Sequence, residues 1–268
     1  MRIPGKHFLR NLVERRTLLF QLVRRDFKQR FVGSAAGWVW GLIHPVVLLI
    51  SWVFVFQVCL HTELPPNSVT QSYPLFLFCG ILPWLLFQET VTRSASSLLD
   101  HAGLITKTVF PAEIVPVSIF LSSLINHLLA LGLVVIVVGL YVGHFSLWML
   151  SLPLYMALIG LFAVGVGWIV ASLQVYLRDT VQVLTVVLTF WFWVTPIFID
   201  EKQFPPQARF LLHLNPLAFL VTAYRERLLS YRLPNIHDFL VVAAYAVTAF
   251  IIGGLFFRHL KRGFADVL

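Results

Sequence analysis

No group of side chains in this sequence has the spacing of a catalytic or metal site. The nine histidines are scattered, and none has a carboxylate at ligand spacing. The chain has no Gly-x-x-x-x-Gly-Lys-Ser/Thr phosphate loop, no His-Glu-x-x-His and no Gly-x-Ser-x-Gly. Asp200 and Glu201 are adjacent, so their side chains point to different sides of a helix or strand. We therefore expect no enzyme activity, no metal ion and no cofactor in this chain.

Cationic side chains are concentrated near the N-terminus, where they could bind phosphate groups. Nine of the 20 Lys and Arg residues precede residue 31. Within residues 17–31, apolar residues alternate with Arg24, Arg25, Lys28 and Arg30. This pattern predicts an amphipathic helix that lies in the membrane interface with its basic residues toward lipid phosphates. The alternative is a solvated basic tail.

A second polar block, which runs from about residue 94 to 108, follows an apolar run that begins at Tyr73. The block lacks proline, and its pattern predicts a short amphipathic helix at the membrane surface. A helix exposed there could pass the movement of a soluble partner into the membrane. A structured loop between two spans is the alternative. The candidate contact residues of this helix are Ser97, Asp100, His101, Leu104 and Lys107.

Aromatic side chains form a third group with possible binding chemistry. Trp84 and Phe87 lie in one apolar run, and Trp191 and Trp193 lie in another, where four aromatic residues follow one another. Tryptophan commonly anchors helices at bilayer interfaces. Four consecutive aromatics point all around a helix, however, so some must face protein or a cavity. There they could stack on sugar rings.

The composition places these groups in a membrane protein. Of the 268 residues, 59% are hydrophobic and 12% are charged, and the mean hydropathy is +0.84. A polytopic membrane protein fits these values, and the clustering of the charges argues against nucleic-acid binding. The N-terminal basic region is too long for a signal peptide. We predict an all-α fold with six spans near residues 38–60, 73–88, 115–142, 147–173, 181–199 and 239–257.

The basic residues set the orientation of these spans. With both termini inside, inner segments hold fifteen Lys and Arg residues and outer segments hold five. The second run, from Tyr73 to Gln88, is only about 24 Å long as a helix, so it needs residues beyond Glu89 to cross. Arg178 and Asp179 mark a tight inner turn, where they form either a local ion pair or a moving gate contact.

Two further features refine this architecture. The segment 200–236 is an outer loop by parity, yet its middle is apolar and contains Asn215 and Pro216. We predict two re-entrant half-helices that meet there and cap a cavity, with a pair of surface helices as the alternative. Gly33, Gly37 and Gly41 recur at helical spacing and would let another helix approach closely. The chain thus divides into a basic interfacial helix, 1–35, and a six-span domain, 36–268.

Six short motifs in this sequence, taken in order, resemble those of the membrane subunit of ATP-binding-cassette polysaccharide exporters. The resemblance covers almost the whole chain. It is carried by six pieces, each weak alone: the run 25–31 with Ser34, Gly37, Trp40 and Pro45; Gly80-Ile81-Leu82-Pro83-Trp84; Leu104-Ile105-x-Lys107 with Phe110-Pro111; Arg178-Asp179; Thr195-Pro196-Ile197; and Asn215-Pro216.

This resemblance implies a homodimer in the bacterial inner membrane with two copies of a separate cytoplasmic ATPase, which would carry the ATP and Mg²⁺. The helix at 94–108 and the N-terminal helix would contact that ATPase. The implied substrate is a polymer on a lipid diphosphate, whose diphosphate the four basic residues at 24–30 could attract. Chain length and motifs favour O-antigen, and capsule or teichoic acid remains an alternative.

Three rival functions differ in what they require. A drug- or lipid-exporting permease would share the six spans and the ATPase, but the basic interfacial helix favours the polysaccharide branch. A membrane-embedded sugar transferase would need carboxylates at the membrane surface for a metal and a donor sugar, and none is suitably spaced. A passive channel would not need a cytoplasmic docking helix.

Overall fold

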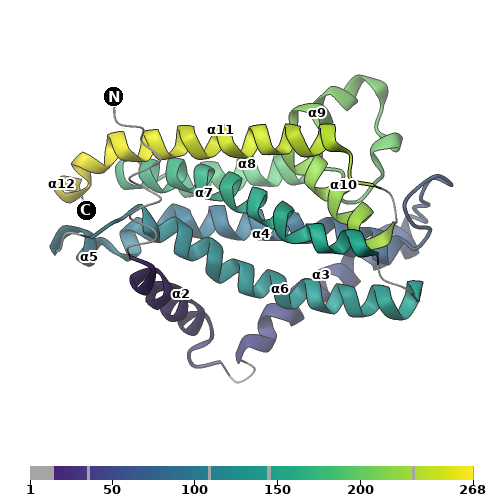
Figure 1. Cartoon of the computed structure of the whole chain (residues 1–268), viewed down its shortest axis with the longest axis horizontal. Coiled ribbons are helices and arrows are strands. Elements are labelled where there is room, and N and C mark those ends of the chain that lie inside the picture. Colours follow the sequence, from purple (N-terminus) through teal and green to yellow (C-terminus); the bar gives the residue numbers. More distant parts are fainter. Residues whose placement is uncertain (1–14, 35–36, 108–109, 144–145, 231–232, 268) are drawn as a thin grey trace.

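The computed structural model is an elongated bundle of helices (Figure 1). It describes residues 15–34, 37–107, 110–143, 146–230 and 233–267. No strand occurs among these residues. The all-helical fold predicted from the sequence is therefore confirmed. Residues 1–14 and 35 of the predicted N-terminal segment, and the side chain of Lys107, lie outside the described residues.

Five helices are long and apolar enough to cross a membrane. They are Gly37–Cys59, which contains α3 (Trp40–Val53); α4 (Tyr73–Asp100); α6 (Ile114–Val142); Leu147–Tyr176, which contains α7 (Leu152–Tyr176); and Ile236–Gly263, which contains α11 (Ile236–Leu260). The sixth apolar helix, α8 (Thr180–Val194), has 15 residues. At about 1.5 Å per residue it falls short of a bilayer core of about 30 Å. It ends where Pro196 interrupts the predicted fifth span.

The central helices are α4 and α7. In the apolar 18-residue stretch of each, 78% and 72% of the residues are buried. Helix α6 packs on α4, α11 packs on α7, and α2 (Arg16–Phe31) packs on α6. Small residues permit the closest approach. A Cβ on Gly165 of α7 or Gly253 of α11 would collide with the backbone of the other helix. Helix α3 has no buried residue among those described, and α8 has only Leu184 and Leu188 buried.

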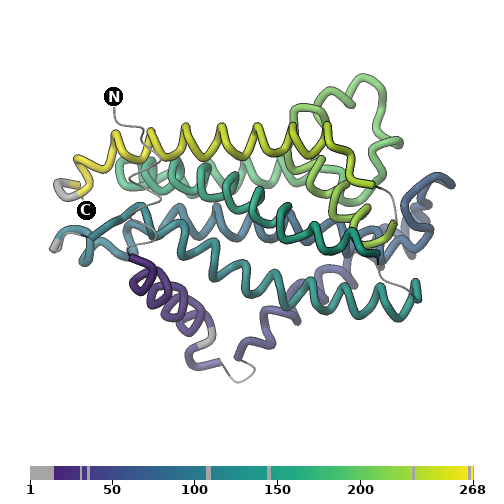
Figure 2. The backbone as a smooth tube through the Cα atoms, viewed as in Figure 1, coloured from purple at the N-terminus to yellow at the C-terminus, as the bar shows by residue number. Residues whose placement is uncertain are grey.

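The two ends of the bundle differ (Figure 1). Helices α2, α5 (Ala102–Lys107) and α12 (Phe264–Val267) gather at one end, hereafter the basic end. At the other end, hereafter the far end, the chain leaves α8 and passes through two short turns into α9 (Arg209–Leu214) and α10 (Pro216–Leu229). Figure 2 traces this green segment as a loop that projects beyond the helices.

The structure differs from the sequence predictions in two places. The amphipathic helix predicted at 94–108 is not one element, because α4 continues to Asp100 and only α5 is separate. No proline or glycine lies between Trp84 and Asp100 to stop α4. The prediction that Gly33, Gly37 and Gly41 share one helix face is also wrong. Gly33 and Gly37 have φ of +78° and +54°, so they separate α2 from α3. Only Gly41 lies within α3.

Candidate functional site

A cavity of about 580 Å³ opens between α3, α4, α6 and α8. Its composition changes along its length. On α4 its lining runs from Leu82 and Trp84 to Glu89 and Arg93, so the wall becomes polar toward the basic end. Other lining aromatics are Trp40, Trp52 and Phe192, and other polar lining residues are His44, Gln88, Thr92, Asn126, His127 and Thr189. Such a space suits a ligand with an apolar or ring-bearing part and a charged end.

Four charged side chains, Asp26, Arg30, Glu89 and Arg93, join α2 to α4 at the polar end of this cavity, and we call them the charged quartet. Arg30 pairs with Glu89, and Arg93 pairs with Asp26. Arg30 also lies 3.6 Å from Asp26, and its Nη2 donates to Ser123 Oγ of α6 at 3.0 Å. These bonds fix the end of α2 on α4 and α6.

Burial makes the charged quartet more than a set of surface ion pairs. Its side chains are 13% to 34% exposed. Burial lowers the pKa of Arg30 below its ordinary value because it disfavours the charged form, and the Glu89 carboxylate opposes that shift. The two positive and two negative groups balance. A phosphate entering here would therefore compete with Asp26 and Glu89 for the arginines.

A second polar cluster lies near the far end and joins α8 to α10. Trp191 Nε1 donates to Asn215 Oδ1 at 2.8 Å, and Asn215 Nδ2 donates to Thr195 Oγ1 at 3.0 Å. Asn215 Oδ1 also accepts from Leu217 N, which caps the start of α10. Pro216 is the first residue of α10, a position where its missing N–H costs nothing. The cluster thus fastens the start of α10 to the end of α8.

Comparison with known proteins identifies the class of this bundle. The family model for ABC-2 type transporters matches residues 17–229. The chain belongs to the ABC-2 type transporter family. The resemblance stated from the sequence motifs is thereby confirmed, and the long apolar helices are those of a multi-pass membrane protein.

Named relatives of this ABC-2 chain match it along nearly its whole length. An O-antigen export system permease protein RfbA of Myxococcus xanthus is 31% identical over 261 residues, 96% of this chain and 98% of that protein. A protein of the same name from Klebsiella pneumoniae is 26% identical and covers 94% and 95% of the two chains. The polysialic acid transport protein KpsM of Escherichia coli is 23% identical, covering 88% and 91%.

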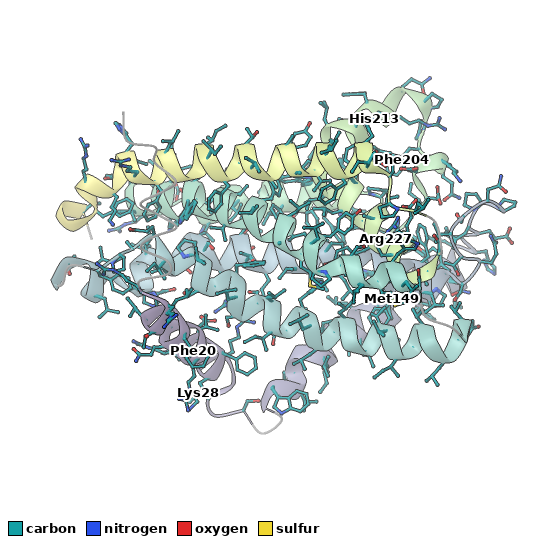
Figure 3. The ribbon with its side chains drawn as sticks, viewed as in Figure 1. Phe20, Lys28, Met149, Phe204, His213 and Arg227 are labelled. Carbon is teal, nitrogen blue, oxygen red and sulfur yellow. The ribbon has the colours of Figure 1, made fainter. Side chains whose placement is uncertain are left out.

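The four basic residues predicted to meet lipid phosphates lie on α2 but do not share one environment. Arg24, Arg25 and Lys28 are exposed, and Lys28 projects from the lower edge of the molecule in Figure 3, away from the bundle. Phe20 on the same helix is also exposed. Arg30 instead turns inward to the charged quartet. The structure therefore separates three surface cations from one that fastens the helix.

The predicted aromatic residues also divide. Trp84 lines the cavity, and its Nε1 donates to Gln88 Oε1 at 2.6 Å. Phe87 lies outside the cavity lining and is buried between Phe162 and Trp191, with ring centroids 5.2 and 5.3 Å away. Trp191 belongs to the Asn215 cluster. Trp193 is 58% exposed on the opposite side of α8 and stacks on Phe198.

The residues predicted to contact a soluble partner lie at the basic end. Ser97 is buried in α4, with its Oγ donating to Ser94 O, so only the residues after it reach the surface. Asp100 and Leu104 are exposed, and His101 Nδ1 lies 2.8 Å from Ser97 O. Arg178 and Asp179 are exposed in the turn between α7 and α8, and no ion pair joins these two described residues.

Two parts of the site were not predicted from the sequence. One is the pairing of Asp26 with Arg93, although the i,i+4 spacing of Asp26 with Arg30 and of Glu89 with Arg93 was a usable signal. The other is Arg225, counted in the sequence as an outer-loop charge, which is 3% exposed inside the far end. Its only signal was an arginine in the otherwise apolar run 216–225.

Proposed function

We propose that this chain is the membrane subunit of an ATP-driven exporter that moves a lipid-diphosphate-linked polysaccharide, O-antigen by preference, from the cytoplasm across the inner membrane. The observation that carries the proposal is the cavity between α3, α4, α6 and α8, whose aromatic walls lead to charged residues at the basic end. The full-length similarity to O-antigen export permeases supports the choice of polymer.

The cavity offers separate surfaces for the parts of such a substrate. The tryptophan faces can stack on the apolar faces of sugar rings. At the polar end, four buried atoms of the described residues have no hydrogen-bond partner: Asp26 Oδ2, Arg30 Nε, Arg93 Nη1 and Asn126 Oδ1. Of the two that belong to cavity-lining residues, Arg93 Nη1 is a cationic donor suited to phosphate, 3.9 Å from Glu89 Oε1, and Asn126 Oδ1 is an acceptor suited to a hydroxyl. The head group would thus be bound where the charged quartet meets the lipid interface.

The exposed spans support a homodimer around a shared path. Helix α3 has no described residue buried, and α8 exposes Val183, Val186, Phe190 and Trp193. Two copies that face each other across these helices would enclose their cavities between them. In this arrangement α8 and the irregular residues 195–199 together make the fifth of six spans. Both termini and α5 are then cytoplasmic, and α9 and α10 form a re-entrant pair in the outer leaflet.

The motor would be a separate ATPase, present in two copies and carrying the ATP and Mg²⁺. Helix α5 and the exposed Asp100 form the surface at the basic end to which it would bind. Residues Ser97, His101, Leu104 and Lys107 would support or extend this surface. The ABC-2 family membership supports such a partner.

A capsule polymer is the second candidate substrate, because the polysialic acid transport protein KpsM also matches 88% of this chain. Its identity of 23% is lower than the 31% of the Myxococcus xanthus O-antigen permease. The same architecture would serve either polymer.

The function is tested by removing the protein and locating its polymer. Cells lacking this chain should still make the polymer and should retain it inside on its lipid carrier, because a diphosphate crosses hydrocarbon at a cost of at least several kcal/mol. Blots of surface and intracellular material with O-antigen and capsule antibodies measure both outcomes. Normal surface polymer in the null would falsify the export function. A null with no polymer anywhere, after toxicity is excluded, would favour a transferase.

A further inference from the structure

Arg225 of α10 is buried at 3% exposure and is bonded to three backbone carbonyls on two different elements. Its Nε donates to Phe76 O of α4 at 3.0 Å, its Nη1 to Pro196 O at 2.6 Å and its Nη2 to Ile197 O at 2.6 Å. Its guanidinium carbon lies 3.5 Å from the centre of the Phe76 ring. Among the described residues, no carboxylate forms an ion pair with it. We call this set of contacts the Arg225 clamp.

The clamp compensates for the early end of α8. A helix leaves its last carbonyls without intrahelical donors, and in a membrane such groups must be satisfied by protein. Beyond Val194 the chain is irregular, and the carbonyls of Pro196 and Ile197 point to Arg225. Residues 195–199 are therefore held by a side chain from another helix.

Helix α4 is shaped to receive this guanidinium. Gly80 lies opposite it, and a Cβ on Gly80 would collide with all three of Arg225 Nη2, Nε and Cζ. Tyr73 at the start of α4 adds a second tie to the same segment, because its hydroxyl donates to Phe198 O at 3.0 Å. Residues 195–199 are thus bonded to α4 at Tyr73 and, through Arg225, at Phe76.

The same α4 reaches the opposite end of the molecule. It runs without interruption from Tyr73 to Asp100, where His101 and α5 follow, and 28 residues correspond to about 42 Å. Its basic half carries Glu89 and Arg93 of the charged quartet. Pro83 lies within α4 between these two halves and removes one of its backbone hydrogen bonds. A displacement of α4 at α5 that is passed along the helix beyond Pro83 therefore moves the segment 195–199, so long as the Arg225 clamp holds.

We propose that Arg225 is a positioning residue that fastens the segment 195–199 to α4, so that motion of α4 is transmitted to the far end of the path. The assignment of this motion to export rests on the proposed function. The fastening itself rests on the contacts of Arg225 and Gly80. Gly80 provides the space that the guanidinium needs.

The fastening can be measured without transport, through the native thiol of Cys79. This residue neighbours Gly80 and is fully buried, whereas Cys59 is exposed and is removed as Cys59→Ser. In membrane vesicles, a small methanethiosulfonate should label Cys79 about tenfold faster in Arg225→Met, because three charge-assisted bonds are lost. Gly80→Ala should act in the same direction. Matched controls are Arg209→Met, which removes an exposed arginine bonded to Phe204 O and Lys202 O, and Gly132→Ala, which adds a methyl in open space.

The double variant Gly80→Ala/Arg225→Met decides whether the two residues act together. If both changes open the same clamp, the double variant should label no faster than Arg225→Met alone. Rates that multiply, or unchanged labelling in both single variants at normal membrane levels, would overturn the proposal. Arg225→Lys, which keeps one donor group, should label at an intermediate rate. Loss of all three single variants from the membrane, with both controls present, would make Arg225 a folding residue and overturn it as well.

Transport then separates this proposal from the export function. In Arg225→Met, ATP hydrolysis by the complex should continue while surface polymer falls, because the motor moves α4 without moving the far end. Wild-type surface polymer in a variant with fast Cys79 labelling would show that the fastening exists but transmits nothing, which overturns the positioning role. A null with normal surface polymer would instead remove the export function and leave the labelling result standing.

Discussion

Two sets of arginine contacts hold this molecule together at its two ends, and they are built differently. In the charged quartet, Arg30 and Arg93 meet the carboxylates of Glu89 and Asp26, with side chains 13% to 34% exposed. In the Arg225 clamp, the guanidinium of a 3% exposed residue donates to backbone carbonyls and lies over the Phe76 ring. Figure 3 shows a second buried arginine of α10, Arg227, at the same far end.

The difference follows from where each set must work. At the basic end, water and lipid head groups can replace a broken ion pair, so opposite charges can part and meet again at moderate cost. At the far end, the carbonyls of Pro196 and Ile197 accept from no other donor among the described residues, and without them the guanidinium would be an unpaired buried charge. The ion pairs of the charged quartet can therefore change partners, whereas the bonds of the Arg225 clamp must stay intact.

The largest expected effect is that of Arg225→Glu, which turns a donor into an acceptor facing three other acceptors. The buried carboxylate would have no donor, which costs about 3 to 5 kcal/mol, a large part of a typical protein's stability of about 5 to 15 kcal/mol. We expect little inserted protein, measured by blotting detergent-extracted membranes. Arg209→Glu on the exposed surface is the control. Wild-type amounts of the Arg225 variant would contradict the assignment of the clamp as a structural bond.

The next largest effect is expected from inverting a charge in the charged quartet, and it distinguishes the quartet from the Arg225 clamp. Asp26→Arg alone would place three arginines together and should weaken the attachment of α2 by about 1 to 3 kcal/mol. The double variant Asp26→Arg/Arg93→Asp restores opposite charges between α2 and α4 but creates like-charge neighbours within each helix, at 26 and 30 and at 89 and 93, so it should recover part of the loss. Thermal unfolding in detergent and surface polymer both measure this recovery. No recovery would show that the quartet depends on exact geometry, as the Arg225 clamp does.

The same contrast explains how much of the structure could be predicted from the sequence. The apolar runs defined the helices because in a membrane every backbone group must be bonded within its own segment. The boundary between α9 and α10 at Asn215 and Pro216 could also be predicted from the sequence, because a proline cannot continue a helix and an asparagine can cap one. The end of α4 at the basic end was predicted too early because a change from apolar to polar residues does not itself end a helix.

The Arg225 clamp could not be predicted for a different reason. The acceptors of Arg225 are the backbone carbonyls of Ile197, Pro196 and Phe76, which lie 28, 29 and 149 residues earlier in the chain. Every residue has a carbonyl, so the sequence does not mark the ones that accept. The pairing of Asp26 with Arg93 was partly legible from charge types but not from position, since 67 residues separate them. Contacts with the backbone are the ones that a side-chain pattern does not reveal.

A smaller effect is expected at Asn215, which lies beside the clamp but is not charged. Asn215→Ala removes the cap of α10 and the bonds to Trp191 and Thr195, and should cost about 1 to 2 kcal/mol. Asn215→Asp keeps an acceptor for Trp191 and Leu217, but it loses the donor to Thr195 and buries a carboxylate at a position that is 5% exposed. It should therefore cost more than Asn215→Ala at neutral pH and less at a pH low enough to protonate that carboxylate. Unfolding midpoints of the two variants at both pH values test this order. A smaller cost for Asn215→Asp at neutral pH would mean that the bonds from Trp191 and Leu217 outweigh the burial of the charge.

The smallest effect on stability is expected at Trp193. Trp191, two residues earlier on α8, is the matched residue with which it is compared. Trp191→Phe removes the bond to Asn215 and replaces a ring packed on Phe87 and Phe162 by a smaller one, so it should cost at least about 1 kcal/mol, without changing the exposed face of α8. Trp193→Ala removes a 58% exposed ring, so the unfolding midpoint should move less than in Trp191→Phe. If the exposed face of α8 lines the path between two subunits, however, Trp193→Ala should shorten or slow the surface polymer, whereas Trp191→Phe should not. A Trp193 variant with normal polymer and lowered insertion would make this ring a membrane anchor and would move the path to another face.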